Sequence, residues 1–179
     1  MKHLKVALLL FVAALTFQSC KDDEKKANQF NYDSKNYAIS TLLVARNSSG
    51  EKNTDGDSVY VHFAFLLGPG MTFTGSSLSA TSGDIVVLGL ISNTSKGLQS
   101  GTYDVPDGAG ESSPFDMVGG LLLGYNTQTG TGTFTGEIET GSLKLSISGQ
   151  KYTLDGEVKL ENEKLVKIHY SGNVQIIED

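Results

Sequence analysis

The sequence predicts an all-β protein, an antiparallel β-sandwich or β-barrel of about eight to ten strands that follows a cleaved signal peptide. Three observations support this fold class. From Phe30 onward, apolar and polar residues alternate with a period of two, as in strands that bury one face. Clusters of Gly, Asn, Asp and Pro separate the alternating segments. No stretch of about a dozen residues in this part lacks Gly, Pro or a β-branched run, which argues against a helix.

The N-terminal segment, residues 1–19, has the features of a signal peptide. A short basic start is followed by an apolar stretch from Val6 to Phe17, which is too short to cross roughly 30 Å of hydrocarbon as a helix. Ser19 then places a small residue before Cys20, the single cysteine of the chain. This junction resembles a lipobox, which implies that Cys20 becomes the lipidated first residue of the mature protein. A free thiol on an exported protein is the alternative.

Residues 20–29 are polar, charged and without apolar periodicity, which predicts a solvated tether. Lys21, Asp22, Asp23 and Glu24 follow the cysteine directly. This run resembles the surface-export signal of outer-membrane lipoproteins of the Bacteroidota type. The resemblance implies a protein that is lipid-anchored in the outer membrane and faces the cell exterior, with the periplasmic face as the alternative.

The remaining residues, 30–179, are interpreted as a single all-β domain, because about 150 residues suit one core. Aromatic residues on both sides of Asp33-Ser34 predict a small hairpin over 30–37. In the clearest strand, 59–67, every odd position is large and apolar, whereas Ser58, His62 and Ala64 stand among the even positions. The expected strands of the first two thirds are the hairpin and the segments 37–44, 59–67, 84–91, 101–105 and 117–125.

The last third of the chain predicts an antiparallel meander. Turn-forming residues at 148–150 and 161–163 separate clearly alternating segments. The expected strands are 134–140, 142–148, 151–160 and 164–177.

Strand and turn signals recur along the domain at Phe30-x-Tyr32-Asp33, Gly101-Thr-Tyr103 and His169-Tyr170-Ser-Gly172. These signals resemble the small all-β domains of uncharacterised Bacteroidota-type lipoproteins. Such families mostly lack an assigned activity, so the resemblance implies a fold and a location rather than a reaction. Because the chain has no Trp, it lacks the Gly-x-Trp of lipocalins, which argues against a lipocalin-type ligand cavity.

The charge of the chain disfavours two classes of partner. It carries 14 Lys and Arg against 20 Asp and Glu, and loss of residues 1–19 removes two lysines, which leaves 12 basic and 20 acidic residues and a charge of −8. Nucleic acid is not expected as a partner, because affinity for phosphate chains comes largely from clustered Lys and Arg. Anionic lipid headgroups would also be repelled, so attachment to a membrane requires the lipid on Cys20.

No motif for metal or cofactor binding stands out. Asn53-Thr-Asp55-Gly-Asp57 has oxygen ligands at alternate positions, as a calcium loop does, but Ala64 occupies the twelfth position, where an EF-hand needs Glu. A solvated hairpin loop is therefore favoured, although calcium binding by a loop stays open. His62 and His169 lie within predicted strands, where a structural role is favoured over metal ligation. We expect no metal and no cofactor.

Catalysis has no sequence support either, because no Gly-x-Ser-x-Gly elbow is present and triads depend on geometry. We assign no catalytic residue and expect a non-enzymatic binding or accessory module. The expected ligand is a glycan or a protein, bound by the Gly/Ser/Thr-rich segments 68–83, 92–101 and 106–116. Candidates for stacking on a ligand are Tyr32, Tyr37, Tyr60, Tyr103, Tyr125, Tyr152 and Tyr170.

Two alternatives remain open at this stage. The first is a hydrolase or metal-dependent enzyme with a site on the same loops, which converging carboxylates or a close approach of His62 and His169 would favour. The second is a structural envelope protein that partners another membrane protein. Oligomeric state is not determined by the sequence, because an edge strand can either pair with a second copy or be protected by charge.

Overall fold

The structure, a computed structural model, describes residues 26–74, 77–79, 82–106 and 112–178, and this part of the chain is all-β as predicted. No helix long and apolar enough to span a membrane occurs in these ranges. The strands are β1 (Gln29–Tyr32), β2 (Lys35–Ala38), β3 (Thr41–Arg46), β4 (Glu51–Lys52), β5 (Ser58–Leu67), β6 (Thr72–Thr74), β7 (Ser77–Ser79), β8 (Gly83–Ser92), β9 (Gly101–Asp104), β10 (Met117–Asn126), β11 (Thr131–Ser148), β12 (Lys151–Leu160) and β13 (Leu165–Glu178).

The strands close into a barrel. Neighbouring strands follow the order β12-β11-β10-β8-β5-β3-β13, and β12 also pairs with β13, which completes the ring. All pairs in the ring are antiparallel except one: residues 174–178 of β13 run parallel to residues 42–46 of β3. The choice between sandwich and barrel, which the sequence left open, is therefore decided by hydrogen bonding between the two ends of the domain.

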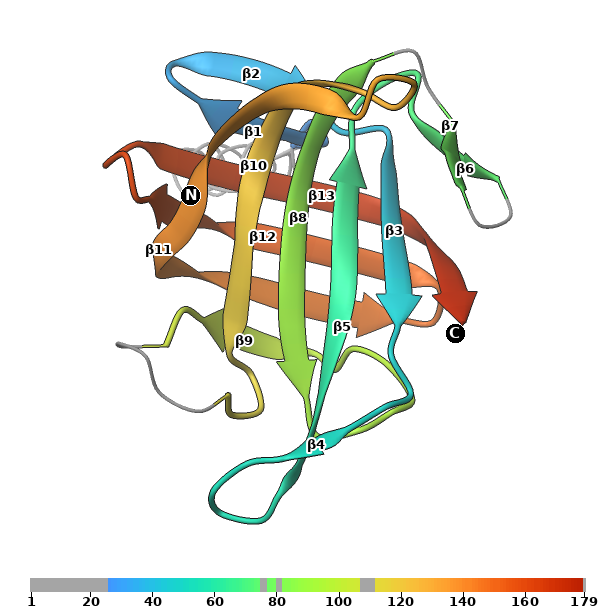
Figure 1. The fold of residues 1–179 in the computed structure, drawn as a ribbon, viewed down its shortest axis with the longest axis vertical. Coiled ribbons are helices and arrows are strands. Elements are labelled where there is room, and N and C mark those ends of the chain that lie inside the picture. The colour runs from blue at the N-terminus through green and yellow to red at the C-terminus, as the bar shows by residue number, and fades with distance from the viewer. Residues whose placement is uncertain (1–25, 75–76, 80–81, 107–111, 179) are drawn as a thin grey trace, which may run out of the picture.

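The barrel is flattened into two layers that cross (Figure 1). The front sheet consists of β3, β5, β8, β10, the first part of β11 and the last part of β13. Its strands β3, β5, β8 and β10 run lengthwise in the view. The back sheet consists of β1, β2, β9, β12, the second part of β11 and the first part of β13. β11 and β13 belong to both layers, because long strands that pass from one sheet to the other form the corners of such packings.

One element differs from the prediction at Gly141. The segments 134–140 and 142–148 were expected as separate strands, but both belong to β11, which continues from the front sheet into the back sheet. Gly141 has φ = +119°, and a Cβ there would lie 2.5 Å from the carbonyl oxygen of Glu157. The glycine therefore marks a close approach of β11 to β12 within one strand rather than a turn.

The opposite difference occurs at Ser40. Residues 37–44 were expected as one strand, but the chain leaves the back sheet after β2 and enters the front sheet as β3. The Ser40 hydroxyl donates to the carbonyl oxygens of Leu67 and Gly68 at 3.1 and 2.9 Å, and the Ser40 N–H donates to Leu67. These hydrogen bonds hold the chain where it passes from the back sheet to the front sheet. The expected hairpin over 30–37 and the turns at 148–150 and 161–163 are confirmed.

A single core fills the space between the two sheets. Leu66 and Leu88 of the front sheet and Leu154 and Ile168 of the back sheet are buried in one cluster. A ring of about eight strands leaves an interior just wide enough for side chains. The interior of this slightly smaller ring is occupied by the protein itself.

The front sheet also has an apolar outer face, because β5 turns its even positions inward. His62, Ala64 and Leu66 point into the barrel, whereas Phe63 is 43% exposed. The β6–β7 hairpin, which lies within the predicted loop 68–83, packs on part of this outer face through Phe73. The two outer faces of the barrel therefore differ: the front one is apolar, and the back one is polar.

Candidate functional site

The predicted lipidation and export residues, Cys20 and Lys21 to Glu24, lie outside the described residues. The described chain enters the fold before Phe30, because Asn28 is bonded to the middle of β13: its Oδ1 accepts from the Ser171 N–H at 2.7 Å. β1 then begins at Gln29. The last residues assigned to the tether thus belong to the folded domain, where they help to form the candidate site described below.

The loops expected to bind ligand have structural roles where they are described. In the segment 92–101, the loop is held by His62. The Nε2 atom of His62 lies 2.9 Å from the carbonyl oxygen of Thr94, and its Nδ1 accepts from the Asn47 N–H at 3.2 Å. A carbonyl can only accept, so the proton of the neutral ring is on Nε2. Ser92 donates to Gly97 within the same loop. The structural interpretation of His62 is therefore supported.

The other candidates from the sequence are distributed over the fold. Asn53 closes the loop between β4 and β5, where its Oδ1 accepts from the Asp57 N–H at 2.8 Å, so this segment is a hairpin loop as expected. Tyr32, Tyr103, Tyr152 and Tyr170 are buried in the core, and the other three tyrosines are half-buried. No group of three or more His, Cys, Asp and Glu that could hold a metal occurs within the described ranges.

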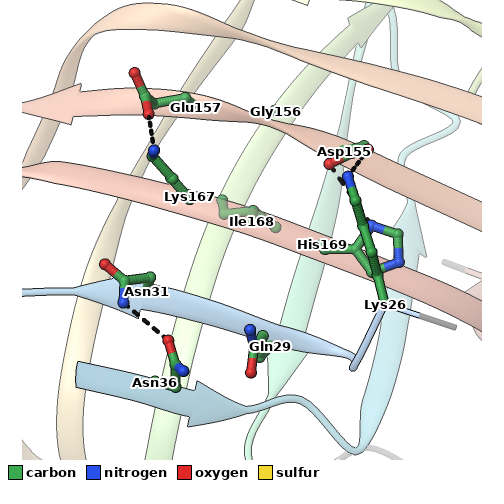
Figure 2. Close-up of a pocket in the computed structure, with 10 residues that line it drawn as sticks. All are labelled: Lys26, Gln29, Asn31, Asn36, Asp155, Gly156, Glu157, Lys167, Ile168 and His169. Atoms are coloured by element: carbon green, nitrogen blue, oxygen red, sulfur yellow. Dashed lines mark hydrogen bonds and ion pairs between the residues drawn. The ribbon is translucent and has the colours of Figure 1, made fainter. Parts of the chain in front are cut away.

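The most developed pocket lies on the outer face of the back sheet (Figure 2). It has a volume of about 610 Å³. The lining comes from the chain before β1 and from β1, β2, β12 and β13, and its residues are Lys26, Gln29, Asn31, Asn36, Asp155, Gly156, Glu157, Lys167, Ile168 and His169.

Strand register explains why these polar side chains converge. Asp155 of β12 pairs with His169 of β13, which in turn pairs with Gln29 of β1. In the next row of the same face, Glu157 pairs with Lys167. Residues two apart on a strand share one face, so the two rows form a continuous polar surface.

Asp155 is the electrostatic centre of the pocket. Its Oδ2 accepts from the Lys26 ammonium at 3.0 Å, and its Oδ1 lies 3.6 Å from Nδ1 of His169. The hydrogen bond from Lys26 lowers the pKa of the Asp155 carboxyl, and the charge of the lysine and the neighbouring His169 act in the same direction against partial burial. The carboxylate therefore stays ionised across the physiological range.

Several polar groups in the pocket have unused hydrogen-bonding capacity. Nδ1 of His169 is buried and has no hydrogen-bond partner, because Asp155 is too far away for a bond. The amide of Gln29 makes no side-chain hydrogen bond to any described residue, and Asn31 uses only its Nδ2, which donates to Asn36 at 2.8 Å. A buried unsatisfied nitrogen such as that of His169 is uncommon in native proteins and calls for an explanation such as a water or a ligand, whereas Gln29 and Asn31 are half-buried.

The two histidines are not brought together. His62 is fully buried inside the barrel on β5, whereas His169 lies on the outer face of the back sheet. The close approach of the two histidines, one of the two features that would have favoured the enzyme alternative, is thus not found among the described side chains. Two carboxylates, those of Asp155 and Glu157, do line the pocket. Sequence reasoning missed Lys26, Gln29, Asp155 and His169 as a group, because the alternating polar positions show an outer face but not which strands lie side by side.

Comparisons with profiles of protein families, with curated proteins and with solved structures find no match.

Proposed function

We propose that this protein is an outer-membrane lipoprotein, anchored through acylated Cys20 and displayed on the cell exterior, that acts as a non-enzymatic binding module. The run Lys21 to Glu24 after the cysteine supports surface display. The pocket on the back sheet is the ligand site of the proposal, and its ligand is a glycan or a short polar segment of a protein.

One observation carries the binding function. The pocket contains a buried imidazole nitrogen of His169 and an amide of Gln29 that have no partners, beside the ionised carboxylate of Asp155. A ligand that supplies hydroxyl or N–H groups would satisfy them, and leaving the buried nitrogen of His169 unpaired costs about 1–3 kcal/mol. The packed interior supports the same conclusion, because binding then has to take place on the outside of the barrel.

The position of Lys26 connects the pocket with the proposed anchor. Lys26 lies over the pocket and is six positions after Cys20. Six residues extend at most about 21 Å, so a lipid on Cys20 keeps the pocket close to the membrane surface. A ligand carried by a neighbouring molecule of the same surface would be within reach.

The anchor is tested by metabolic lipid labelling and by protease treatment of intact cells. We expect the native chain to be labelled and digested, the Cys20→Ala variant to be unlabelled, and a chain lacking Lys21 to Glu24 to be labelled but protected. A labelled chain that is protected in its native form would place the protein on the periplasmic face instead.

The pocket is tested by NMR titration of the chain with N-acetylglucosamine, glucose, galactose and a set of polar dipeptides. We expect the His169 ring and the backbone amides of β1, β12 and β13 to shift with at least one probe. Gln29→Ala should weaken that binding, and Ser146→Ala, at an exposed position of the same sheet, should leave it unchanged. Shifts confined to the described loops between strands would contradict this site.

A further inference from the structure

The outer face of the front sheet is apolar across four neighbouring strands. Phe65 of β5 pairs with Val87 of β8, and Leu122 of β10 pairs with Phe134 of β11. Phe63 lies opposite Gly89 of β8, which also pairs with Val118 of β10, so these side chains lie on the same face. We define the apolar outer face by Phe63, Phe65, Val87, Val118, Leu122 and Phe134. Figure 1 is viewed from this side.

Part of this side of the front sheet is already covered by the protein itself. Met71, ahead of β6, is buried against Leu67 and Ile85, and Phe73 and Leu78 of the β6–β7 hairpin pack on the same cluster. Outside the hairpin the surface is open: Phe63 is 43%, Val118 48% and Phe134 55% exposed. Contiguous apolar surface of this kind marks interaction sites in soluble domains.

A groove runs through the open part. It has a volume of about 430 Å³ and is lined by Val87, Val118, Gly119, Gly120, Leu122, Phe134 and Glu137. Gly120 makes room for it, because a Cβ at that position would lie 2.9 Å from the Phe134 ring. The groove therefore has apolar walls and a backbone floor, the shape that accepts one bulky apolar side chain.

The membrane that holds the anchor does not reach this face. The two sheets turn their inner faces to one core, so their outer faces lie on opposite sides of the barrel. Lys26 is bonded to the back sheet, and Cys20 is within about 21 Å of it. A tether of this length holds the back sheet, rather than the opposite face of the barrel, near the membrane. This step rests on the lipid anchor of the proposed function.

Charge argues against a second copy. A twofold dimer is isologous, so both copies would contribute the apolar outer face. The second copy would then bring a second Glu137 and no Lys or Arg from the residues that line the groove. Like charges would meet without a complementary partner, which favours a different protein as the occupant.

The charge at the groove specifies this partner further. Glu137 is the charged residue in the lining, is exposed, and has no ion pair to any described residue. Charge complementarity at an interface selects between partners. We propose that the apolar outer face docks a separate protein through a segment in which a bulky apolar residue stands beside Lys or Arg.

The test uses the mature acylated chain in lipid nanodiscs and a phage-displayed library of random peptides. We expect selected peptides that combine Leu, Ile, Phe or Trp with a neighbouring Lys or Arg. Val118→Asp should weaken their binding at least tenfold, and Glu137→Lys should shift the selection from basic to acidic neighbours. Ser146→Asp, on the opposite sheet, is the matched control and should leave the selection unchanged. Peptides that bind the Val118→Asp variant equally well would overturn the proposal.

The two excluded occupants are tested with a Val118→Cys variant in the same nanodiscs. Oxidation to a disulfide-linked dimer would show that a second copy covers the face, and burial of a fluorophore on that cysteine in lipid would show that the membrane does; either result overturns the proposal. A chain that carries no lipid at Cys20 refutes the anchor of the proposed function and this inference with it. An anchored chain that selects no such peptides refutes the docking surface alone.

Discussion

The Lys26 ammonium donates to Oδ2 of Asp155 at 3.0 Å, a contact between positions 129 residues apart. It joins the chain ahead of β1 to the middle of β12, so the start of the domain is bound to the back sheet at the pocket. The tether and the candidate ligand site thus share one residue. Substitutions of Lys26 or Asp155 therefore test both the attachment of the chain ahead of β1 and the candidate ligand site.

Removing Lys26 should raise the pKa of Asp155 toward its ordinary value of 3.8. A carboxyl with a lowered pKa in the folded state contributes stability above its ordinary pKa, and that contribution is lost as the pH falls through the folded value. The contribution should be small, about 0–1 kcal/mol, because both side chains are largely exposed. NMR titration of the Asp155 carboxyl carbon in the native and Lys26→Ala chains measures the shift. An identical midpoint in both chains would refute the contact.

The two histidines should respond differently to replacement by alanine. His62→Ala removes the bonds to Thr94 and Asn47 and opens a cavity, and we expect a loss of about 2–4 kcal/mol in the free energy of unfolding. His169→Ala, on the outer face, should cost about 1 kcal/mol or less. Urea unfolding of both variants gives the comparison. Equal losses in the free energy of unfolding would argue that the bonds of His62 to Thr94 and Asn47 do not stabilise the fold.

Tyr103 should weaken the fold at high pH. Burial raises the pKa of this tyrosine above 10.0, so its stability contribution is complete below pH 10 and is lost as the pH rises through the folded value. The hydroxyl donates to the Gln99 carbonyl at 2.9 Å, so Tyr103→Phe should cost about 0.5–1.5 kcal/mol at neutral pH. The variant should also lose less stability above pH 10, although Tyr170, whose pKa burial raises as well, keeps part of the slope. If the urea midpoint depends on pH in the same way in Tyr103→Phe and in the native chain, the raised pKa of Tyr103 is contradicted.

The close approach of β11 to β12 depends on glycine at position 141. In Gly141→Ala the new Cβ would lie 2.6 Å from Cα of Val158, at a φ of +119° that other residues avoid, and we expect a loss above about 3 kcal/mol in the free energy of unfolding. Gly149→Ala is the control, because that turn position also has positive φ but open space, and it should cost about 1 kcal/mol. Urea unfolding of the two variants gives the comparison, and similar midpoints would mean that β11 and β12 do not approach so closely at Gly141.

The orientation of β5 can be tested from its two faces. Leu66→Ala, inside the barrel, should cost about 2–5 kcal/mol through lost burial and a cavity. Phe63→Ser, on the apolar outer face, should change the free energy of unfolding by less than about 1 kcal/mol. Thermal and urea unfolding measure both. A larger loss for Phe63→Ser would mean that the odd positions of β5 form the core.

Local sequence patterns were sufficient to predict most strands and turns. The hairpin around Asp33, the strands that became β5, β8, β10, β12 and β13, and the turn at Gly149 all follow from period-two alternation and turn residues. The errors at Ser40 and Gly141 have one cause. Whether a chain bends, turns or changes sheets depends on the carbonyl groups it meets, and those belong to distant segments such as Gly68 and Glu157.

Which face of each strand is buried could be decided only from the tertiary structure. In β5 both faces carry apolar residues, so alternation alone favours the larger odd side chains as the buried set. The structure buries the even side instead: His62, Ala64 and Leu66 are fully buried inside the barrel, where His62 finds hydrogen-bond partners in two loops. The odd side then becomes the apolar outer face that we assign to a partner.

By itself the sequence determined the all-β class and most strand segments and turns, and it carries the pattern on which the proposed lipidation and export rest. These features depend on residues that are neighbours in the sequence, because period-two alternation, turn residues and the pattern of a signal peptide are all local. The closed ring, the direction of each face and the pocket at Asp155 and His169 were decided only by the tertiary structure. They depend on the register between β1, β12 and β13, and register is set by packing and hydrogen bonds between segments far apart in the chain.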